Sequence, residues 1–457
     1  MQGRLFRTWR RVLALAWPVM TEQTLRTLMR TVDVLVTATF SPVAVVAVGL
    51  ADLYGRIPLR VGIGLGAAAI ALSSQDTGAG ADANRDSAVS AALAMGVLAG
   101  VPVALAGVFF GVPLIGVFGA DADTAALGAT YLGIVLATAP ARHVSIISAR
   151  ALQGTGDTRT PMYVNFVANG LNITGSLTLG LGLFGLPRLQ VVGVAAATAT
   201  ANLVSAALLV ATTYTSRTPI RLVRPRDLRV ARQLVSLAVP KIAEGLSSTV
   251  AEFPFNAVLL GFGTPVNAGF QIGRRVYQQV TGPLSRGYRT AVSVLVGHAL
   301  GDADPGEARY LGWSVTLLGV LTVGGVGVLT VHYADSLVAL LAAGSPEALP
   351  YAADFARVYG ITAGFVVAFT VLSGALNGAS ETRIPFAARL TGVFGGMLGV
   401  TYLLGVRAGW GPLGAYAGIA VQYVWMAAVA AFGFHFSDWA ARAADMMAAR
   451  GTPAGDD

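Results

Sequence analysis

The sequence predicts an all-α polytopic membrane protein with twelve transmembrane helices in two pseudo-symmetric six-helix bundles. Three observations lead to this prediction. The chain is 54% hydrophobic and only 12% charged, whereas a soluble domain carries about 25% charged residues. Apolar stretches of about 20 residues, each long enough to cross a bilayer, recur along it. The eleven residues from Ala151 to Pro161 return 224 residues later, from Ala375 to Pro385, with six positions identical. Such a repeat in an apolar chain indicates two homologous halves and is typical of transporters.

Twelve apolar stretches are the predicted spans. In the first half they cover 13–37, 43–71, 88–112, 125–150, 160–184 and 190–214. In the second half they cover 234–260, 265–297, 308–332, 352–375, 384–406 and 412–436. The 56 glycines fit close helix packing and kinks in lipid. The period-2 alternation of a membrane barrel is absent, so we expect helices.

Further matches extend the repeat and divide the chain. Pro18 matches Pro240, and Glu22 matches Glu244, both 222 residues apart. Since each half holds six helices, the two copies have the same orientation. We expect an N-terminal bundle over 1–214, a cytoplasmic linker over 215–232, a C-terminal bundle over 233–436 and a cytoplasmic tail over 437–457. Residues 438–447 of the tail are mildly amphipathic and predict a short interfacial helix.

The distribution of arginines predicts the orientation. Eighteen arginines fall in one alternating set of loops and termini, and only Arg188 and Arg407 fall in the other. This is the positive-inside pattern of an even number of spans in the cell membrane, with both termini cytoplasmic. The net charge of +8 therefore reflects topology, and no aromatic-interleaved basic patch accompanies it. We expect a monomer whose partners are membrane lipids and a small-molecule substrate, with no nucleic acid.

Several chemistries are unexpected in this chain. The absence of cysteine excludes disulfides, thiol catalysis and thiolate metal sites. The four histidines lack metal-ligand spacing, and there is no Walker motif. The glycines of 62–66 lie inside a predicted helix, where small residues are packing surfaces. We therefore expect no enzyme, no cofactor and no metal beyond a coupling H⁺ or Na⁺.

Polar stripes run along several predicted spans, although ionisable groups in lipid cost about 2.5–3.5 kcal/mol each. In the first span they fall at spacings of four, four and three, and in the seventh at spacings of four, so each set shares one helix face. Such stripes are tolerated where they face water or partners in a cavity. The side chains expected to line the cavity are Glu22, Arg26, Arg30, Asn165, Asn169, Glu244, Ser248, Asn256, Arg275 and Gln279.

Two structural alternatives stay open for these stripes. Residues near helix ends, such as Glu22, can extend their polar groups to the lipid headgroups. Arg30 and Asp33 can also form an ion pair whose role is purely structural. Either alternative removes single residues from the cavity without changing the membrane architecture.

The repeated string has the composition of a tight cytoplasmic turn. Gly154 and Gly156 permit a sharp turn after the fourth span. Thr160 is the expected N-cap of the next helix and Pro161 its first residue. Asp157 adds negative charge near that helix N-terminus. We assign no substrate chemistry to this string.

Taken together, several motifs resemble a known family. The string Gln153–Pro161 closely resembles the helix 4–5 loop of multidrug and toxic compound extrusion (MATE) transporters. Val32-Asp33-Val34 followed by Ala47-Val48-Gly49-Leu50 resembles their first two helices. Gly193-Val194 followed by 196–200 resembles the start of their sixth helix. The resemblance covers about residues 10–436 and implies a cation-coupled exporter that alternates between inward- and outward-open states.

The resemblance also implies a coupling site. Asp33 matches the first-helix Asp that the family uses for proton or sodium coupling. Asn172 matches an Asn of the fifth helix, whereas Ser176 stands where archaeal relatives have an Asp. Thr200 matches a Thr of the sixth helix. Another branch uses a Glu in the seventh helix, for which Glu252 is the candidate and Glu244 a second one.

Three functions remain after this reading. The first is a secondary active antiporter that exports organic cationic or amphipathic compounds in exchange for H⁺ or Na⁺. The second is a flippase of the wider superfamily for a lipid-linked or anionic substrate, an alternative with which the intramembrane arginines are compatible. The third is a membrane enzyme, for which no nucleophile, base or metal constellation is visible.

Overall fold

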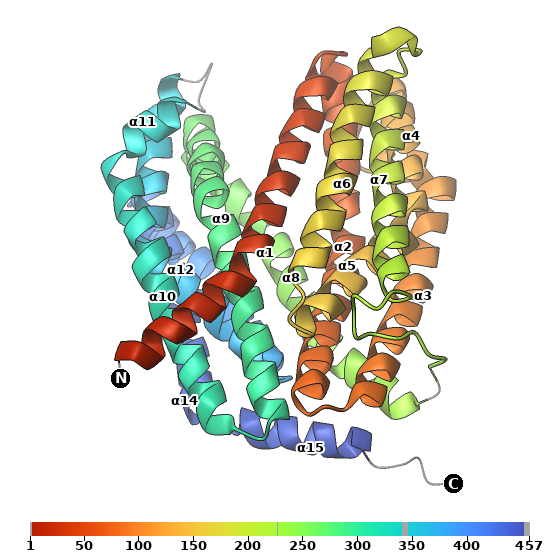
Figure 1. Ribbon diagram of the computed structural model, residues 1–457. Helices are drawn as coiled ribbons and strands as arrows, with labels where there is room; N and C mark the ends of the chain where they lie inside the picture. The colour runs from red at the N-terminus through yellow and green to blue at the C-terminus, as the bar shows by residue number, and fades with distance from the viewer. Residues whose placement is uncertain (1, 226, 341–345, 452–457) are drawn as a thin grey trace. The chain divides into compact units, whose positions relative to one another are not determined.

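The chain folds into helices, most of them joined by short connections (Figure 1). The computed structural model describes residues 2–225, 227–340 and 346–451. No strand occurs in these ranges, which confirms the all-α fold class. Among the described residues, seven helices are long and apolar enough to cross a membrane, or eight if the bent pair α4–α5 is one span. The other four predicted spans, now α1, α6 with η1, α8 and α9, contain the polar stripes, which lower their hydropathy.

The helices extend beyond the predicted spans at most ends. The first half contains α1 (Gln2–Ala38), α2 (Pro42–Gly78), α3 (Asp82–Gly116), α4 (Ala122–Ala137), α5 (Ala139–Gly154), α6 (Arg159–Gly175), the π-helix η1 (Ser176–Gly180), the 3₁₀ turn η2 (Leu183–Gly185) and α7 (Gln190–Thr212). The second half contains α8 (Leu228–Phe262), α9 (Thr264–Gly301), α10 (Pro305–His332), α11 (Ala334–Ala339), the 3₁₀ turn η3 (Pro346–Ala348), α12 (Leu349–Gly378), α13 (Arg383–Thr391), the π-helix η4 (Gly392–Arg407), α14 (Pro412–Phe436) and α15 (Trp439–Gly451).

Three predicted spans are interrupted. The stretch 125–150 bends by 47° between α4 and α5. The stretches 160–184 and 384–406 change from α- to π-helix, at Ser176 and Gly392 respectively. Hydrophobic periodicity over a whole span does not reveal such local changes in winding.

The chain forms two compact units. The N-unit comprises Thr21–Val239 and Ala448–Asp457, and the C-unit comprises Met1–Met20 and Pro240–Met447. The chain passes between the units within α1 and α8, close to the repeated Pro18 and Pro240, where proline removes a backbone hydrogen bond. The predicted bundle boundaries, at residues 214 and 233, differ from these crossing points and stay a prediction.

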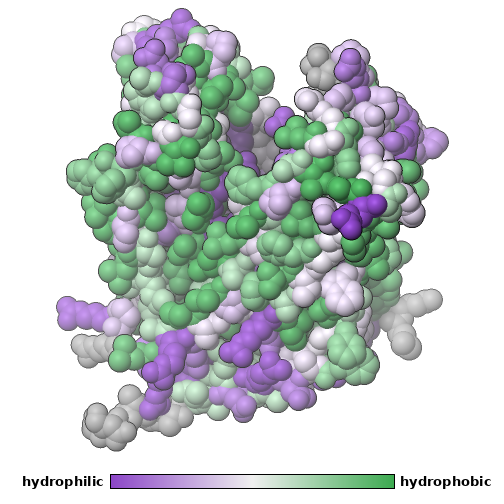
Figure 2. All heavy atoms as spheres, turned by 180° about the vertical axis from the view of Figure 1, so that it is seen from behind, coloured by the Kyte–Doolittle hydropathy of each residue, from purple (hydrophilic) through white to green (hydrophobic). Residues whose placement is uncertain are grey.

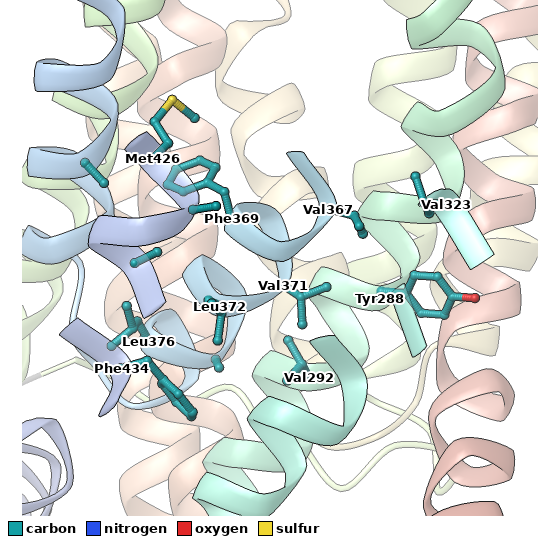
Figure 3. Packing of buried hydrophobic residues seen from close by; sticks show 14 of the residues in the cluster. Tyr288, Val292, Val323, Val367, Phe369, Val371, Leu372, Leu376, Met426 and Phe434 are labelled. Carbon is teal, nitrogen blue, oxygen red and sulfur yellow. The ribbon is translucent and has the colours of Figure 1, made fainter. Parts of the chain in front are cut away.

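Each unit has its own apolar core. In the N-unit, α2 packs on α3, α4 and α5, and α6 packs on α7. In the C-unit, α12 lies among α9, α10 and α14. Figure 3 shows Val367, Val371 and Leu372 of α12 with Val292 of α9 and Met426 of α14 in this core. Hydrophobic residues also cover most of the visible surface (Figure 2), as expected for a protein in lipid.

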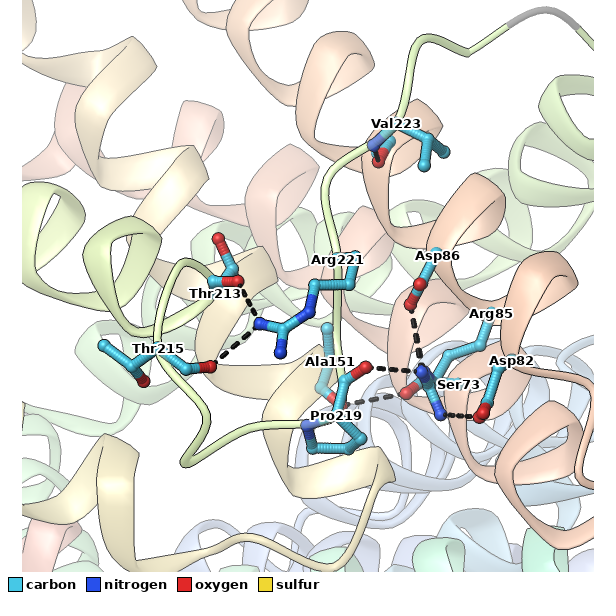
Figure 4. A network of polar contacts seen from close by, with 11 residues as sticks. Ser73, Asp82, Arg85, Asp86, Ala151, Thr213, Thr215, Pro219, Arg221 and Val223 are labelled. Carbon is cyan, nitrogen blue, oxygen red and sulfur yellow. Dashed lines mark hydrogen bonds and ion pairs between the residues drawn. The ribbon is translucent and has the colours of Figure 1, made fainter.

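The predicted linker is held against the start of α3 in the N-unit. Arg85 is buried, donates to the carbonyl oxygen of Pro219 at 2.6 Å and pairs with Asp86 at 3.1 Å (Figure 4). The backbone N–H of Val223 donates to Ser90 Oγ at 2.9 Å. Because a buried guanidinium needs acceptors, the linker carbonyl is part of this charge network.

The repeated string forms a turn in both copies, with one correction. Gly156 has a φ of 91°, and Ser380, its counterpart, has a φ of 57°. Gly154 is the last residue of α5, and a Cβ there would lie 2.8 Å from Ser73 Cβ of α2. Thus Gly156 makes the turn, whereas Gly154 permits close helix packing.

The prediction that Thr160 caps α6 is wrong. The helix begins at Arg159, and Asp157 Oδ1 accepts from the backbone N–H groups of Arg159 and Thr160 at 3.1 and 2.9 Å. Glu381 does the same in the second copy, accepting from Arg383 and Ile384. A carboxylate in this position also favours the helix macrodipole.

The tail forms α15, which begins in the C-unit and ends in the N-unit. In the C-unit, Trp439 is buried and stacks on Phe434 at 5.0 Å. In the N-unit, Arg450 is buried and pairs with Asp76 of α2 at 2.8 Å. The predicted interfacial helix therefore docks on protein at both of its ends.

Candidate functional site

Asp33 meets the start of the π-helix in the N-unit. Ser176 Oγ donates to Asp33 Oδ1 at 2.7 Å. Ser176 is fully buried, and Asp33 is partly buried. Asp33 and Ser176, which the sequence predicted to belong to one coupling site, therefore form a direct contact between α1 and η1.

Asn172 lies one turn before Ser176 and contacts the same carboxylate. With its amide oriented so that both groups are satisfied, the Asn172 nitrogen donates to Asp33 Oδ1 and Oδ2 at 3.0 and 3.2 Å, and its oxygen accepts from Thr198 Oγ1 at 3.0 Å. This arrangement suits an ionised Asp33.

The structure corrects the contribution of α7. Thr198 bonds to Asn172, whereas the side chain of Thr200 is exposed and no hydrogen bond joins it to this cluster in the described ranges. Residues two apart on a helix face different sides, so Thr198 and Thr200 cannot both face α6. Tyr131 of α4 is also in hydrogen-bonding contact with Thr198. We call Asp33, Asn172, Ser176 and Thr198 the Asp33 cluster.

Small residues let α7 approach α6 and η1 closely enough to form this cluster. A Cβ at Gly193 would lie 2.5 Å from the carbonyl carbon of Leu179. A Cβ at Gly175 would lie 2.8 Å from Ala197 Cβ. The backbones are therefore in direct contact on both sides of Thr198, as small residues permit in membrane helices.

Further charges surround the Asp33 cluster. Asp52 of α2 and Arg30 of α1 are close enough to act electrostatically on Asp33. No ion pair joins Arg30 to Asp33, both described residues, so the structural ion-pair alternative is not formed. Arg142 of α5 also acts on Asp52, and our sequence reading missed it. Its position inside an apolar span was the available signal, because a charge there is costly.

Other predicted residues of the N-unit lie on the same helices. Glu22 is buried and pairs with Arg26 at 3.3 Å. Asn165 is buried and accepts from Ser205 Oγ at 3.4 Å, and Asn169 is buried one turn further along α6. These residues form polar contacts between packed helices, and their predicted role as cavity lining stays a prediction.

A second polar cluster joins α8 to α9 in the C-unit. Glu252 pairs with Arg274 at 2.9 Å. Asn256 Oδ1 accepts from Asn267 and Gln271, both at 2.8 Å. The stripe on α8 thus finds partners on α9.

Two neighbours on α9 do not take part in this cluster. Arg275 and Gln279 are exposed, and Arg274 is the arginine that pairs with Glu252. Ser248 of α8 bonds back to the carbonyl oxygen of Glu244 at 3.4 Å. Glu244 itself is buried and pairs with Lys241 at 2.5 Å, a partner that the sequence reading did not consider.

The family model named MatE matches residues 18–178 and 240–403, one copy in each half of the repeat. The chain belongs to the MatE family. Among curated proteins, this MatE-family chain is 29% identical over 437 residues to a probable multidrug resistance protein NorM of Rhodopseudomonas palustris, covering 93% of this chain and 90% of that one. It is also 29% identical over 421 residues to the protein of the same name from Bradyrhizobium diazoefficiens, covering 90% and 89%.

Solved structures agree with this assignment at the level of the fold. A crystal structure described as MATE in the bent conformation superposes on the MatE-family chain with a TM-score of 0.86 at 18% identity, over 98% of this chain and 99% of that one. The chain is thus a multi-pass membrane protein of a transporter family. In the described ranges, no group of three or more His, Asp and Glu residues is arranged to hold a metal ion.

Proposed function

We propose that this MatE-family chain is a secondary active antiporter that exports organic cationic or amphipathic compounds in exchange for H⁺ or Na⁺ by alternating access. The multidrug-resistance names of its relatives support the export of organic compounds. The observation that carries the coupling proposal is the contact of Asp33 with Ser176 and Asn172.

In this proposal Asp33 exchanges one monovalent cation per cycle. A proton binds the Asp33 carboxylate, and its loss restores an anion that accepts from the Asn172 amide and the Ser176 hydroxyl. Na⁺ instead takes oxygen ligands from Asp33, Asn172, Ser176 and Thr198. Ser176 replaces a second carboxylate, so the cluster holds one negative charge and is neutral with one bound cation.

The test is efflux from proteoliposomes with imposed proton and sodium gradients, each applied alone. Asp33→Asn should reduce gradient-driven efflux of a fluorescent organic cation to the rate without a gradient, because the amide keeps the shape and loses the exchangeable charge. Asp123→Asn, which changes an exposed carboxylate in the first turn of α4, should transport like the unmodified chain.

Full coupling in Asp33→Asn would refute this role for Asp33. The response of the unmodified chain to each separate gradient identifies the ion. Efflux that follows neither gradient would refute coupled antiport as a whole.

The second candidate is a flippase for a lipid-linked or anionic substrate. It is supported by the excess of basic side chains in the spans, such as Arg30, Arg56 and Arg142 against Asp33 and Asp52 in the N-unit. Movement of a labelled anionic headgroup between leaflets, without efflux of organic cations, would favour it over the antiporter.

A further inference from the structure

Four charged side chains converge inside the C-unit. Lys241 and Glu244 lie one turn apart on α8, and the Lys241 ammonium is 2.5 Å from Glu244 Oε2. The guanidinium of Arg389 on α13 is 3.5 Å from Glu244 Oε1. Arg289 on α9 is close enough to act electrostatically on both Glu244 and Arg389. Three cations therefore surround one carboxylate.

The cluster has more donors than its carboxylate can satisfy. An ammonium has three N–H donors and a guanidinium five. Both oxygens of Glu244 are already engaged, one by Lys241 and one by Arg389. In the described part of the chain, Arg289 forms no ion pair with any carboxylate. The donors left over need an acceptor with several oxygens.

Burial makes the charge imbalance costly. The side chains of Lys241 and Glu244 are only 4% and 6% exposed, and that of Arg389 is 25% exposed. Buried charges are tolerated where they are paired, and unpaired ones cost several kcal/mol. With one negative charge against three positive ones, the cluster requires about two further negative charges.

The other half of the repeat shows that the helix packing itself does not require these cations. Glu22 is the counterpart of Glu244, yet Lys241, Arg289 and Arg389 correspond to Val19, Gly66 and Asn165, at offsets of 222, 223 and 224. Glu22 is instead faced by Arg26 and Arg150, so the repeated architecture does not by itself require these three cations. Their presence in one copy alone indicates a function specific to the C-unit.

We infer that Lys241, Arg289 and Arg389 form a binding site for a phosphate group. A phosphate monoester has a charge of about −1.5 to −2 near neutral pH, which matches the surplus, and three oxygens that accept from arginine forks. Arg389 also lies 4.7 Å from the centre of the Phe369 ring, so its guanidinium plane is held by packing. The phosphate belongs either to a soluble compound or to a lipid headgroup. The inference does not depend on the coupling role of Asp33.

The test is calorimetric titration of inorganic phosphate into the purified full chain in nanodiscs of zwitterionic lipid, at ionic strength matched with chloride. One site is expected. Arg289→Gln and Arg389→Gln should each weaken binding by about 30-fold or more, as when one partner of a buried charge pair is removed. Arg383→Gln, an exposed arginine on the same helix as Arg389, is the matched control and should bind normally.

A second arm identifies the source of the phosphate. If a lipid headgroup is the ligand, nanodiscs with phosphatidic acid should compete with inorganic phosphate in the unmodified chain and fail to compete in Arg289→Gln. Arg389→Lys keeps the positive charge but loses the paired N–H donors of the guanidinium. It therefore tests whether phosphate binding depends on the geometry of these donors and not on charge alone. Asp33→Asn should bind phosphate normally, which separates this site from the coupling proposal.

The inference is overturned if neither phosphate nor the headgroup binds, or if binding is the same in the Gln variants and the control. Thermal melting of each variant establishes that it is folded before titration. If a Gln variant does not fold, phosphate binding to the unmodified chain is compared with binding to Arg389→Lys. Equal affinity in these two proteins would also contradict the proposed site.

Discussion

At the scale of single residues, the carboxylate of the proposed coupling site could be predicted, whereas its neighbours could be predicted only in part. Asp33, Asn172 and Ser176 were chosen from the sequence, and the structure brings them together. Thr200 was chosen by motif, but Thr198 makes the contact. A motif gives the order of residues along the chain, and only the rotation of α7 against α6 decides which Thr faces the cluster.

This difference between the two threonines predicts a difference in activity. Thr198→Val should lower gradient-driven efflux by about fivefold or more, the effect of losing a hydrogen bond of about 1 kcal/mol. Thr200→Val, on the same helix and of the same chemistry, should leave efflux unchanged because Thr200 is exposed. The measurement is initial efflux rate from proteoliposomes at equal protein density. If Thr200→Val lowered efflux and Thr198→Val did not, Thr200 would be the functional threonine, as the sequence motif predicted.

At the scale of elements, twelve apolar stretches were recognisable from composition, whereas their breaks were not. The bend between α4 and α5 and the π-helix that begins at Ser176 depend on backbone hydrogen bonds that hydropathy does not encode. The ends of α6 show the same limit, because Asp157 rather than Thr160 caps it. Both residue types are good caps, and the start of the helix decides between them.

The close contact of α7 with η1 can be tested through glycine. Gly193→Ala should destabilise the protein by about 1–3 kcal/mol, the usual cost of overpacking, because the added Cβ would meet the backbone of Leu179 and Gly180, which cannot move aside. Gly170→Ala on α6 should instead be stabilising by about 0.5–1 kcal/mol, since that position is open and alanine favours helix. Thermal melting of both variants checks this, and equal melting temperatures would contradict it.

At the scale of the whole molecule, the repeat and the arginine distribution were the sequence features that predicted the architecture. Both copies of the repeat match the MatE family model separately. The divergence between copies then becomes informative, because the shared residues maintain the packing. Asp33 corresponds to Phe255 at an offset of 222, and the three cations near Glu244 have no charged counterparts. The sequence alone could not show that these cations meet, since they lie on three helices far apart in the chain.

The same repeat predicts the topology of the whole chain. Leu186 and Ala408 are exposed and lie 222 residues apart in the two arginine-poor connections, so parallel halves place both on the outer side. Ala83, in the first turn of α3 near Arg85, and Thr215, in the arginine-rich linker, are exposed and should be cytoplasmic. Because the chain has no cysteine, a maleimide that reacts with thiols labels only a cysteine introduced at one of these positions. On intact cells, a membrane-impermeant maleimide should label Leu186→Cys and Ala408→Cys, and should label Ala83→Cys and Thr215→Cys only after permeabilisation. Labelling of Leu186→Cys and Ala408→Cys from opposite sides would indicate inverted halves and contradict both the parallel repeat and the predicted orientation.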